Sequence, residues 1–589
     1  MKNKKVLIAA LRGSLALIIG IFLLFKSYGV ELKIYTGNYK SWDFTHNNII
    51  GVYKLGSTKG REYVKITAVN DSITKVEEFN TQNVLQQTIT IFKKAGKIAT
   101  IDYKNLHGFV YRKRKFEHAE GEMLETSKKE GVNEFLPCKG IKHKYKDDIN
   151  YESIYIGMDN KPTTGPSGFC IARYSRFNDE KRWGLAKQIS FHDVNGKPVE
   201  SEFAYHKVAF SRDTLGNVLE EWYYNKANVL TKIPLKVCGL KYKYNNLDQK
   251  IMEEYFDSIK AKTQNVYGIS MEKYEYQNSN LTKLTRYGLN NEIISGTENK
   301  SMDGASIIKH TYDKRGNILT TSYFDKNEKP MNNTNKYFIV ENTYDKYDNK
   351  VSLGYKSMYN FNVDVFGKNK YVYTYDDRGL KLSEAYFNSN GIPIKDRTDE
   401  VFMIKYKYDK EGKQISQSYW QNDSTKMSRL SGAHEYVTKY NDQGQMLELI
   451  SMDDKGKIKT ESFGASKKVY EYDKLSRLSK RKMFNDNGPA TMGSAEVSSF
   501  HAIHYEYDHQ NKVSTISYFD IKGNPTNATV SRYDGDTYVH KVEFIYEGNK
   551  VVSQKWYSTT NVVVKVINCI LQPGMGNFGN GIFWLNTRY

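Results

Sequence analysis

The sequence predicts an all-β protein made of tandem β-hairpins of about 32 residues each, coiled into a solenoid, spiral or open shell. A tyrosine-led turn, such as Tyr312–Gly316 (YDKRG), recurs along most of the chain. A second aromatic element follows each turn, as Tyr323–Phe324 does here. Tyrosine is also abundant, at 47 of 589 residues. A fixed period of this length indicates a stacked array of repeats.

The leading tyrosines define about eleven units, the first of which is a degenerate copy at Arg212–Asn217. The other units begin at Tyr244, Tyr276, Tyr312, Tyr344, Tyr375, Tyr408, Tyr440, Tyr472, Tyr507 and Tyr546. We expect these tyrosines to occupy equivalent positions and to form aromatic ladders in place of an aliphatic core, because a tyrosine ring packs while its hydroxyl stays hydrated or bonded. The residues expected to maintain the repeat structure are Tyr312, Gly316, Tyr375, Gly379, Tyr408, Gly412 and Tyr507.

Each unit is predicted to contain two strands and two turns. Tyr406 and Tyr408 alternate with Lys405 and Lys407, a period of two that places rings and lysines on opposite faces of a strand. In the turn Asp313–Gly316, the aspartate can cap backbone amides and the glycine can take a positive φ, as in a type I turn closed by a glycine bulge. Some twenty such strands cannot stay flat, because sheets twist and long open sheets curl.

The amino terminus carries the prediction of location. Lysines precede Val6–Phe25, an apolar stretch long enough to span a bilayer as one hydrophobic helix. Residues 1–29 are therefore predicted to be a signal anchor, with a cleaved signal peptide or a buried soluble helix as alternatives. The first two place residues 30–589 outside the cytoplasm, anchored in the cell envelope or secreted.

The remaining chain divides into three parts. Residues 30–165 have β-like alternation without a clear motif and are either diverged repeats or a cap. A Pro- and Gly-containing stretch, Pro162–Pro166, marks the boundary to the array at 166–560. Residues 561–589 form an apolar tail. Cys138, Cys170, Cys238 and Cys569 lack zinc-ligand spacing and are expected to be free thiols, with a Cys138–Cys170 bridge as the main alternative.

The motif Tyr-x-Tyr-Asp-x-x-Gly, as in Tyr373–Gly379, resembles the YD repeat of bacterial RHS-type surface and secreted proteins. The resemblance implies repeats wound into a spiral β-sheet. This chain departs from that family in having longer units with an extra turn, as at Phe519–Pro525, and in lacking the Asp-Pro-x-Gly-rich segment that ends a toxin-delivering shell. The tail, with Asn561–Ile567 and Gly574–Ile582, is similar to the start of a PDZ domain but lacks its peptide-binding helix.

The formal net charge of +20 comes largely from lysines within predicted strands. One interpretation is a solvated sheet face whose lysines prevent edge-to-edge aggregation. The other is adhesion to an anionic glycan, lipid headgroup or cell-wall polymer. The densest cluster, Arg112, Lys113, Arg114 and Lys115, is the candidate contact for an anionic partner. Nucleic acid is not expected as a partner of an exported chain.

No pattern in the sequence predicts catalysis, a cofactor or a metal site. The densest histidine group, His501, His504 and His509, does not share one face of a strand. The leading hypothesis is therefore an envelope-anchored, non-enzymatic repeat protein whose extended β surface binds a protein or an anionic surface glycan. The alternative is an accessory or sensor protein in which the array is a spacer for the PDZ-like tail.

Overall fold

The computed structural model describes the chain from residue 30 to residue 568 with short gaps. The gaps are 38–42, 45–48, 51, 55–56, 70–71, 148, 179–183, 295–302, 397–399, 463, 492–499, 530–537 and 548–549. The expected helix within 1–29 and most of the PDZ-like tail lie outside the described residues. Within the described part, no helix is long and apolar enough to cross a membrane.

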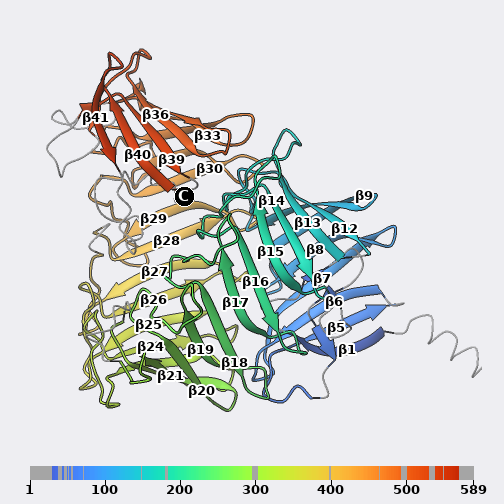
Figure 1. The fold of residues 1–589 in the computed structure, drawn as a ribbon. Coiled ribbons are helices and arrows are strands. Elements are labelled where there is room, and N and C mark those ends of the chain that lie inside the picture. Colours follow the sequence, from blue (N-terminus) through green and yellow to red (C-terminus); the bar gives the residue numbers. More distant parts are fainter. Residues whose placement is uncertain are drawn as a thin grey trace, which may run out of the picture.

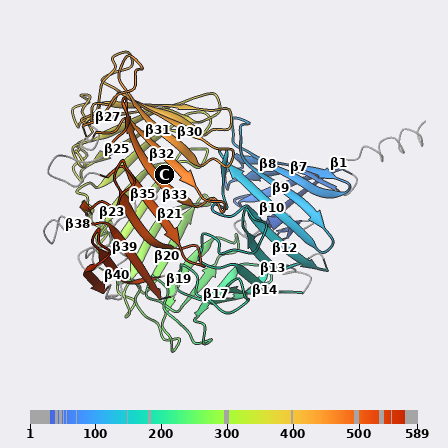
Figure 2. The same ribbon diagram turned by 90° about the horizontal axis from the view of Figure 1, so that it is seen from above.

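The regular elements of the described chain are all β-strands, as predicted, and 37 of them form one antiparallel sheet. Almost every strand pairs with the next one along the chain, from β5 (Tyr63–Val69) and β6 (Ser72–Phe79) to β40 (Lys550–Tyr557) and β41 (Val563–Asn568). The sheet does not stay flat: Figures 1 and 2 show it curling through the green and yellow strands into an open spiral.

One repeat shows how the predicted turn chemistry builds the hairpin. Strand β22 (Ile307–Tyr312) pairs with β23 (Ile318–Phe324), and the register shifts at Tyr312, where the bulge lies. The amide of Gly316, which has a φ of 91°, donates to the carbonyl of Asp313 at 3.2 Å. The carboxylate of Asp313 accepts the amides of Arg315 and Asn317 at 2.8 and 2.9 Å. The turn is therefore held by its own aspartate, as expected.

The length of the unit comes from a third turn that the sequence did not reveal. After the second turn at Asp325–Glu328, the chain makes another turn at Asn333–Lys336 before it enters β24 (Ile339–Tyr344). In several repeats this turn donates an amide to the preceding repeat, as Thr334 does to the carbonyl of Asp303 at 3.1 Å. Equivalent bonds join Glu202 to Ser167, Val266 to Leu235, and Ser462 to Ser431. The third turns thus join neighbouring repeats at one end of their strands.

The leading tyrosines join neighbouring repeats at the other end of the strands, through their hydroxyl groups. Each described hydroxyl donates to a carbonyl at the start of the second strand of the preceding repeat, as Tyr408 does to Lys381 at 2.8 Å. The same bond joins Tyr244 to Val218, Tyr276 to Lys250, Tyr312 to Leu281, Tyr344 to Ile318, Tyr375 to Lys350, Tyr440 to Gln414, Tyr472 to Met446, Tyr507 to Leu478 and Tyr546 to Val513. The hydroxyl gives these positions a reason to be tyrosine rather than phenylalanine.

A ladder of ring contacts runs through other aromatic positions. The rings of Tyr337 and Tyr355 lie 4.7 Å apart, those of Tyr355 and Tyr371 6.4 Å apart, and those of Tyr371 and Tyr386 5.6 Å apart. Tyr386 is 4% exposed and Tyr419, the same position one repeat later, is 1% exposed. These second-element rings share the buried core with aliphatic side chains such as Val401 and Ile404, so the expectation that aromatic rings replace an aliphatic core is only partly right.

Residues 30–165 continue the same sheet and close the spiral onto the array. Their strands are longer, with ten residues in both β7 (Leu85–Lys94) and β9 (Val110–Ala119). Successive turns of this region contact successive first turns of the array. The contacts join Arg61 to Asp248, Asn80 to the carbonyl of Arg315 (2.8 Å), Asn105 to that of Arg378 (2.7 Å), the amide of Asn133 to the carbonyl of Gln443 (3.0 Å), and Asn511 to Thr163 (2.7 Å). The expected boundary near residue 165 falls between two paired strands, β13 (Ile149–Ile156) and β14 (Ile171–Arg176).

Candidate functional site

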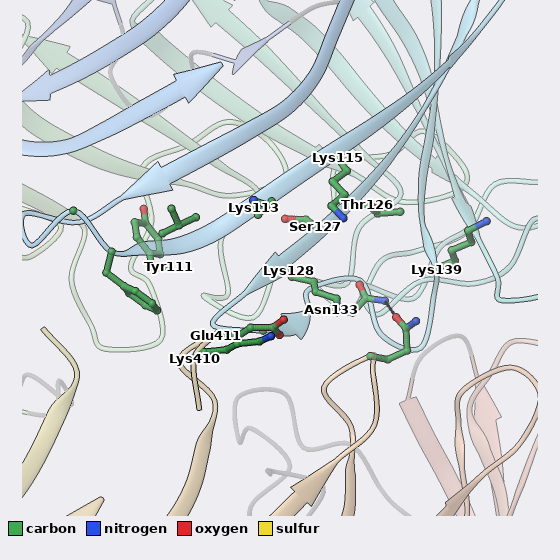
Figure 3. Close-up of a pocket in the computed structure, with 15 residues that line it drawn as sticks. Tyr111, Lys113, Lys115, Thr126, Ser127, Lys128, Asn133, Lys139, Lys410 and Glu411 are labelled. Carbon is green, nitrogen blue, oxygen red and sulfur yellow. Dashed lines mark hydrogen bonds between the residues drawn. The ribbon is translucent and has the colours of Figure 1, made fainter. Parts of the chain in front are cut away.

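A pocket of about 740 Å³ lies where the N-terminal hairpins meet the array. Its upper wall comes from β9 and β10 (Glu122–Lys129), and its floor comes from the array turns that contain Glu411 and Gln443 (Figure 3). The amide of Asn133 holds the floor in place through the carbonyl of Gln443, and their side chains lie 3.4 Å apart. The pocket therefore exists only because the spiral closes.

Five lysines line this pocket and give it a strong positive charge: Lys113, Lys115, Lys128, Lys139 and Lys410. Lys113 and Lys115 extend from the exposed face of β9, and Lys410 lies on the opposite wall (Figure 3). Glu411 is the one carboxylate among the lining residues, and the hydrogen bond from Lys413 lowers its pKa. Five cations therefore face one carboxylate that already has a partner.

Three of these lysines have described partners, and only the partner of Lys113 is a carboxylate. Lys128 donates to the carbonyl of Asp442 at 2.5 Å, and Lys139 donates to the amide oxygen of Asn160 at 2.7 Å. Lys113 lies 3.4 Å from the carboxylate of Asp102. Lys115 and Lys410 make no ion pair with another described residue. Such groups can bind an anion at little desolvation cost, because they remain partly hydrated.

The predicted basic cluster is divided by the alternation of its strand. Lys113 and Lys115 line the pocket, whereas Arg112 pairs with Glu134 at 2.7 Å. Arg114 is buried and forms a two-pronged ion pair with Glu125 at 2.7 and 2.8 Å. Only the two lysines of the cluster can therefore meet a partner at this pocket, a division that the period of two in a strand could have revealed.

The Arg114 pair is a structural element beneath the pocket. Burial alone would raise the pKa of Glu125, but the adjacent Arg114 and a hydrogen bond with His143 outweigh it and hold this pKa well below its usual range. The Nε2 atom of His143 lies 3.1 Å from the carboxylate. Glu125 is therefore ionised at neutral pH and holds the buried face of β9, opposite the face that carries the lysines.

The rest of the lining is apolar and hydroxylated. Phe109 and Tyr111 contribute aromatic surface, and the Arg378 guanidinium lies 5.5 Å from the centre of the Phe109 ring. Thr126 and Ser127 add hydroxyls. The lining contains ammonium groups, hydroxyls and rings, which together suit a ligand with acidic groups and a partly apolar ring.

Sequence reasoning missed Lys128, Lys139 and Lys410 because none of them lies in the basic run at 112–115 and lysines are frequent throughout the chain. Lys128 lies directly opposite Lys113 in the β9–β10 hairpin, whereas Lys410 meets them only through the closure of the spiral, for which the sequence carries no local signal. Among the described residues, no group of three or more His, Cys, Asp or Glu side chains is placed to hold a metal ion.

The predicted repeat residues lie along the seam between the two parts of the sheet. A Cβ atom at Gly412, whose φ is 89°, would lie 3.0 Å from the ring of Phe109. At Gly379, with a φ of 81°, it would lie 2.6 Å from His107, and at Gly316 it would lie 2.5 Å from Gln82. These glycines therefore serve both the turn and the close approach of the N-terminal hairpins.

Comparison with known proteins yields only distant likenesses. No family model and no curated protein matches this chain. Its similarities are to solved structures. TcdB2-TccC3 without its hypervariable C-terminal region aligns with a TM-score of 0.31 at 11% identity, covering 90% of this chain and 29% of that chain. TcdB2-TccC3-Cdc42 aligns with a TM-score of 0.28 at 11% identity, with the same coverage of each chain. A porin-like protein from Bacteroides uniformis ATCC 8492 gives 0.12 at 8% identity, covering 61% of this chain and 95% of that chain.

This chain thus spans under a third of the TcdB2-TccC3 chains. All of these superpositions are too loose to carry an argument about function. The RHS-type resemblance continues to rest on the repeat motif, and the hairpin array rests on the described sheet itself. No comparison supports the PDZ-like likeness of the tail.

Proposed function

We propose that the protein is a non-enzymatic binding protein of the cell envelope, and that the lysine-lined pocket receives an acidic group of a surface glycan. The observation that carries this proposal is the meeting of five lysines, of which only Lys113 pairs with a carboxylate, while the one lining carboxylate, Glu411, is already paired with Lys413. Two of the five come from the predicted basic cluster. The envelope location is supported by the lysine-flanked apolar run at Val6–Phe25.

A glycan suits the pocket better than a small inorganic anion. The volume of about 740 Å³ falls within the range of organic-ligand sites. Phe109 and Tyr111 offer rings against which a sugar can pack, while the ammonium groups provide charge-assisted hydrogen bonds to carboxylate oxygens. A sugar acid presents both chemistries at once.

Calorimetric titration of the full chain with an oligogalacturonate, and with its neutral methyl-esterified form, tests the proposal. We expect binding of the acid form only, weakening with salt because exposed charges are screened. Lys115→Ala and Lys410→Ala should each weaken binding by about fivefold, which corresponds to about 1 kcal/mol.

The matched control is Lys455→Ala, which removes the same charge from an exposed second turn of the array. It should leave the affinity unchanged. Equal losses for Lys455→Ala and Lys115→Ala would reduce the effect to net charge and refute a defined pocket. Equal binding of the esterified form would also refute it.

A further inference from the structure

One repeat carries an exposed aromatic cluster that its neighbours lack. In the loop between β25 (Lys350–Lys356) and β26 (Lys370–Tyr375), Tyr359 is 74% exposed, Phe361 is 71% exposed and Phe366 is 68% exposed. The loop lies at the outer edge of the sheet, away from the seam with the N-terminal hairpins (Figure 1). Several large exposed apolar side chains gathered in one loop are typical of an interaction site.

Comparison between repeats shows that turn geometry does not require these rings. The position of Tyr359 is Asn327 in the preceding repeat, Asn390 in the following one and Lys455 three repeats later. The position of Phe361 is Lys329 in the preceding repeat and Ile392, which is aliphatic, in the following one. Polar residues therefore satisfy the same turns elsewhere, and the aromatic side chains serve another purpose.

The backbone at Phe366 provides independent support. Phe366 and Gly367 form a two-residue turn between Val365 and Lys368, whose amides and carbonyls bond at 2.7 and 3.1 Å. Both central residues have positive φ, 53° for Phe366 and 84° for Gly367. Such a turn favours asparagine or glycine at its first position, and a bulky residue there is strained. Strain retained at an exposed ring points to a role for that ring.

Exposed lysines flank the three rings along the sequence, in the same repeat and in the two neighbouring ones. Lys326, Lys329 and Lys336 precede the cluster, and Lys370 and Lys395 follow it; all five are exposed and none forms an ion pair with another described residue. Among the nearby acidic groups, Glu328 is compensated by Lys283 and Lys309. Asp325 and Asp364 accept backbone amides and keep their charge, so the five lysines outnumber these two carboxylates.

We propose that this aromatic cluster docks onto an anionic lipid surface, with Tyr359, Phe361 and Phe366 entering the headgroup region and the flanking lysines contacting lipid phosphates. Aromatic rings favour the membrane interface, and basic residues near an anionic leaflet add to the attraction. Protein interfaces, by contrast, are depleted in lysine. The combination therefore favours a lipid surface over a protein partner and goes beyond glycan binding at the pocket.

A local probe in the full chain tests the proposal without interference from other membrane-binding segments. Tyr359→Trp and Ile259→Trp place a tryptophan at the same turn position of two repeats. Ile259 is 82% exposed, but no exposed aromatic residue accompanies it in the described part of its own loop. The probe used is vesicles of equal parts phosphatidylcholine and phosphatidylglycerol, with pure phosphatidylcholine for comparison. The signal is the tryptophan fluorescence spectrum of the variant minus that of the parent. We expect this difference spectrum to shift to the blue for Tyr359→Trp on mixed vesicles only, and not to shift for Ile259→Trp.

Phe366→Asn provides a second, stability-controlled test. It creates the Asn-Gly pair that this turn prefers, so the melting temperature should rise while the vesicle-induced shift at a Tyr359→Trp probe falls severalfold. A lower melting temperature would show that the ring stabilises the fold and would overturn the proposal. So would equal shifts at both probe positions, no shift at either, or a concentration-dependent shift without vesicles, which would identify a second copy as the occupant.

Discussion

Removing the hydroxyl of one leading tyrosine should weaken the contact between two neighbouring repeats. In Tyr408→Phe the ring remains, but the bond of 2.8 Å to the carbonyl of Lys381 is lost. A hydrogen bond of this kind contributes about 0.5–1.5 kcal/mol, and the half-buried carbonyl is left without that donor. We expect a loss of about 1–2 kcal/mol. Tyr408→Ala also removes a half-buried ring and should cost roughly 2–4 kcal/mol, somewhat below the loss for a fully buried ring.

The same hydroxyl predicts a response to alkaline pH. Burial raises the pKa of Tyr408 to about 12, with nearby Asp376 adding to the effect. Because the folded pKa lies above the unfolded value of about 10, the stabilising contribution is complete below pH 10 and is lost as pH rises toward 12. Tyr408→Phe should therefore be less stable than the parent at neutral pH, and its free energy of unfolding should depend less on pH above pH 10.

Hydrogen exchange measures both effects locally. The amides of β27 (Lys381–Phe387) and β28 (Met403–Tyr408) should exchange faster in Tyr408→Phe, while strands many repeats away change little, because repeats contact mainly their neighbours. Tyr359→Phe is the control, since its ring is 74% exposed. Unchanged exchange in Tyr408→Phe, or an equal effect in the control, would refute a stabilising role for the hydroxyl bond.

Three further predictions follow from the described contacts. Glu125→Gln should destabilise by about 3–5 kcal/mol, since it leaves a buried guanidinium without its partner; in the parent, the lowered pKa of Glu125 means that this stability is present above pH 4 and lost as pH falls further, so acid titrations of the two proteins should converge. Gly444→Ala and Gly523→Ala share a φ near 80°, yet only the first places a Cβ 2.7 Å from the backbone of Val132; we expect an extra loss of about 1–3 kcal/mol and faster proteolysis of the N-terminal hairpins for Gly444→Ala alone. Asp313→Ala removes two amide caps and should lower the free energy of unfolding in urea by about 1–2 kcal/mol. Asp313→Asn keeps an acceptor oxygen and should therefore retain most of that stability.

The sequence predicted what depends on neighbouring residues. Asp313 and Gly316 fix a turn whichever repeat surrounds them, and the alternation of Tyr406 with Lys405 fixes a strand face. The third turn at Asn333–Lys336 was missed because its residues vary from repeat to repeat, so no fixed letter marks it.

The candidate site was predicted only in part, for a related reason. Lys113 and Lys115 were found as part of a local basic run, but Arg114 in the same run is buried against Glu125. Lys410 reaches the pocket from the other side of the spiral. A pairing that depends on how far a long sheet curls is set by the summed twist of many strands, and no short motif encodes that sum.

The seam between the N-terminal turns and the array turns restricts how this chain can evolve. A meander of like hairpins can ordinarily gain or lose a copy without harm, because each copy needs only its neighbours. Here Asn80 must meet the turn of Arg315 and Asn133 must meet that of Gln443. Duplicating one hairpin between these contacts would leave every later partner one turn out of step. The number of copies along the seam should therefore be inherited as a unit, and variation in length should accumulate beyond Asn511, after the last of these contacts.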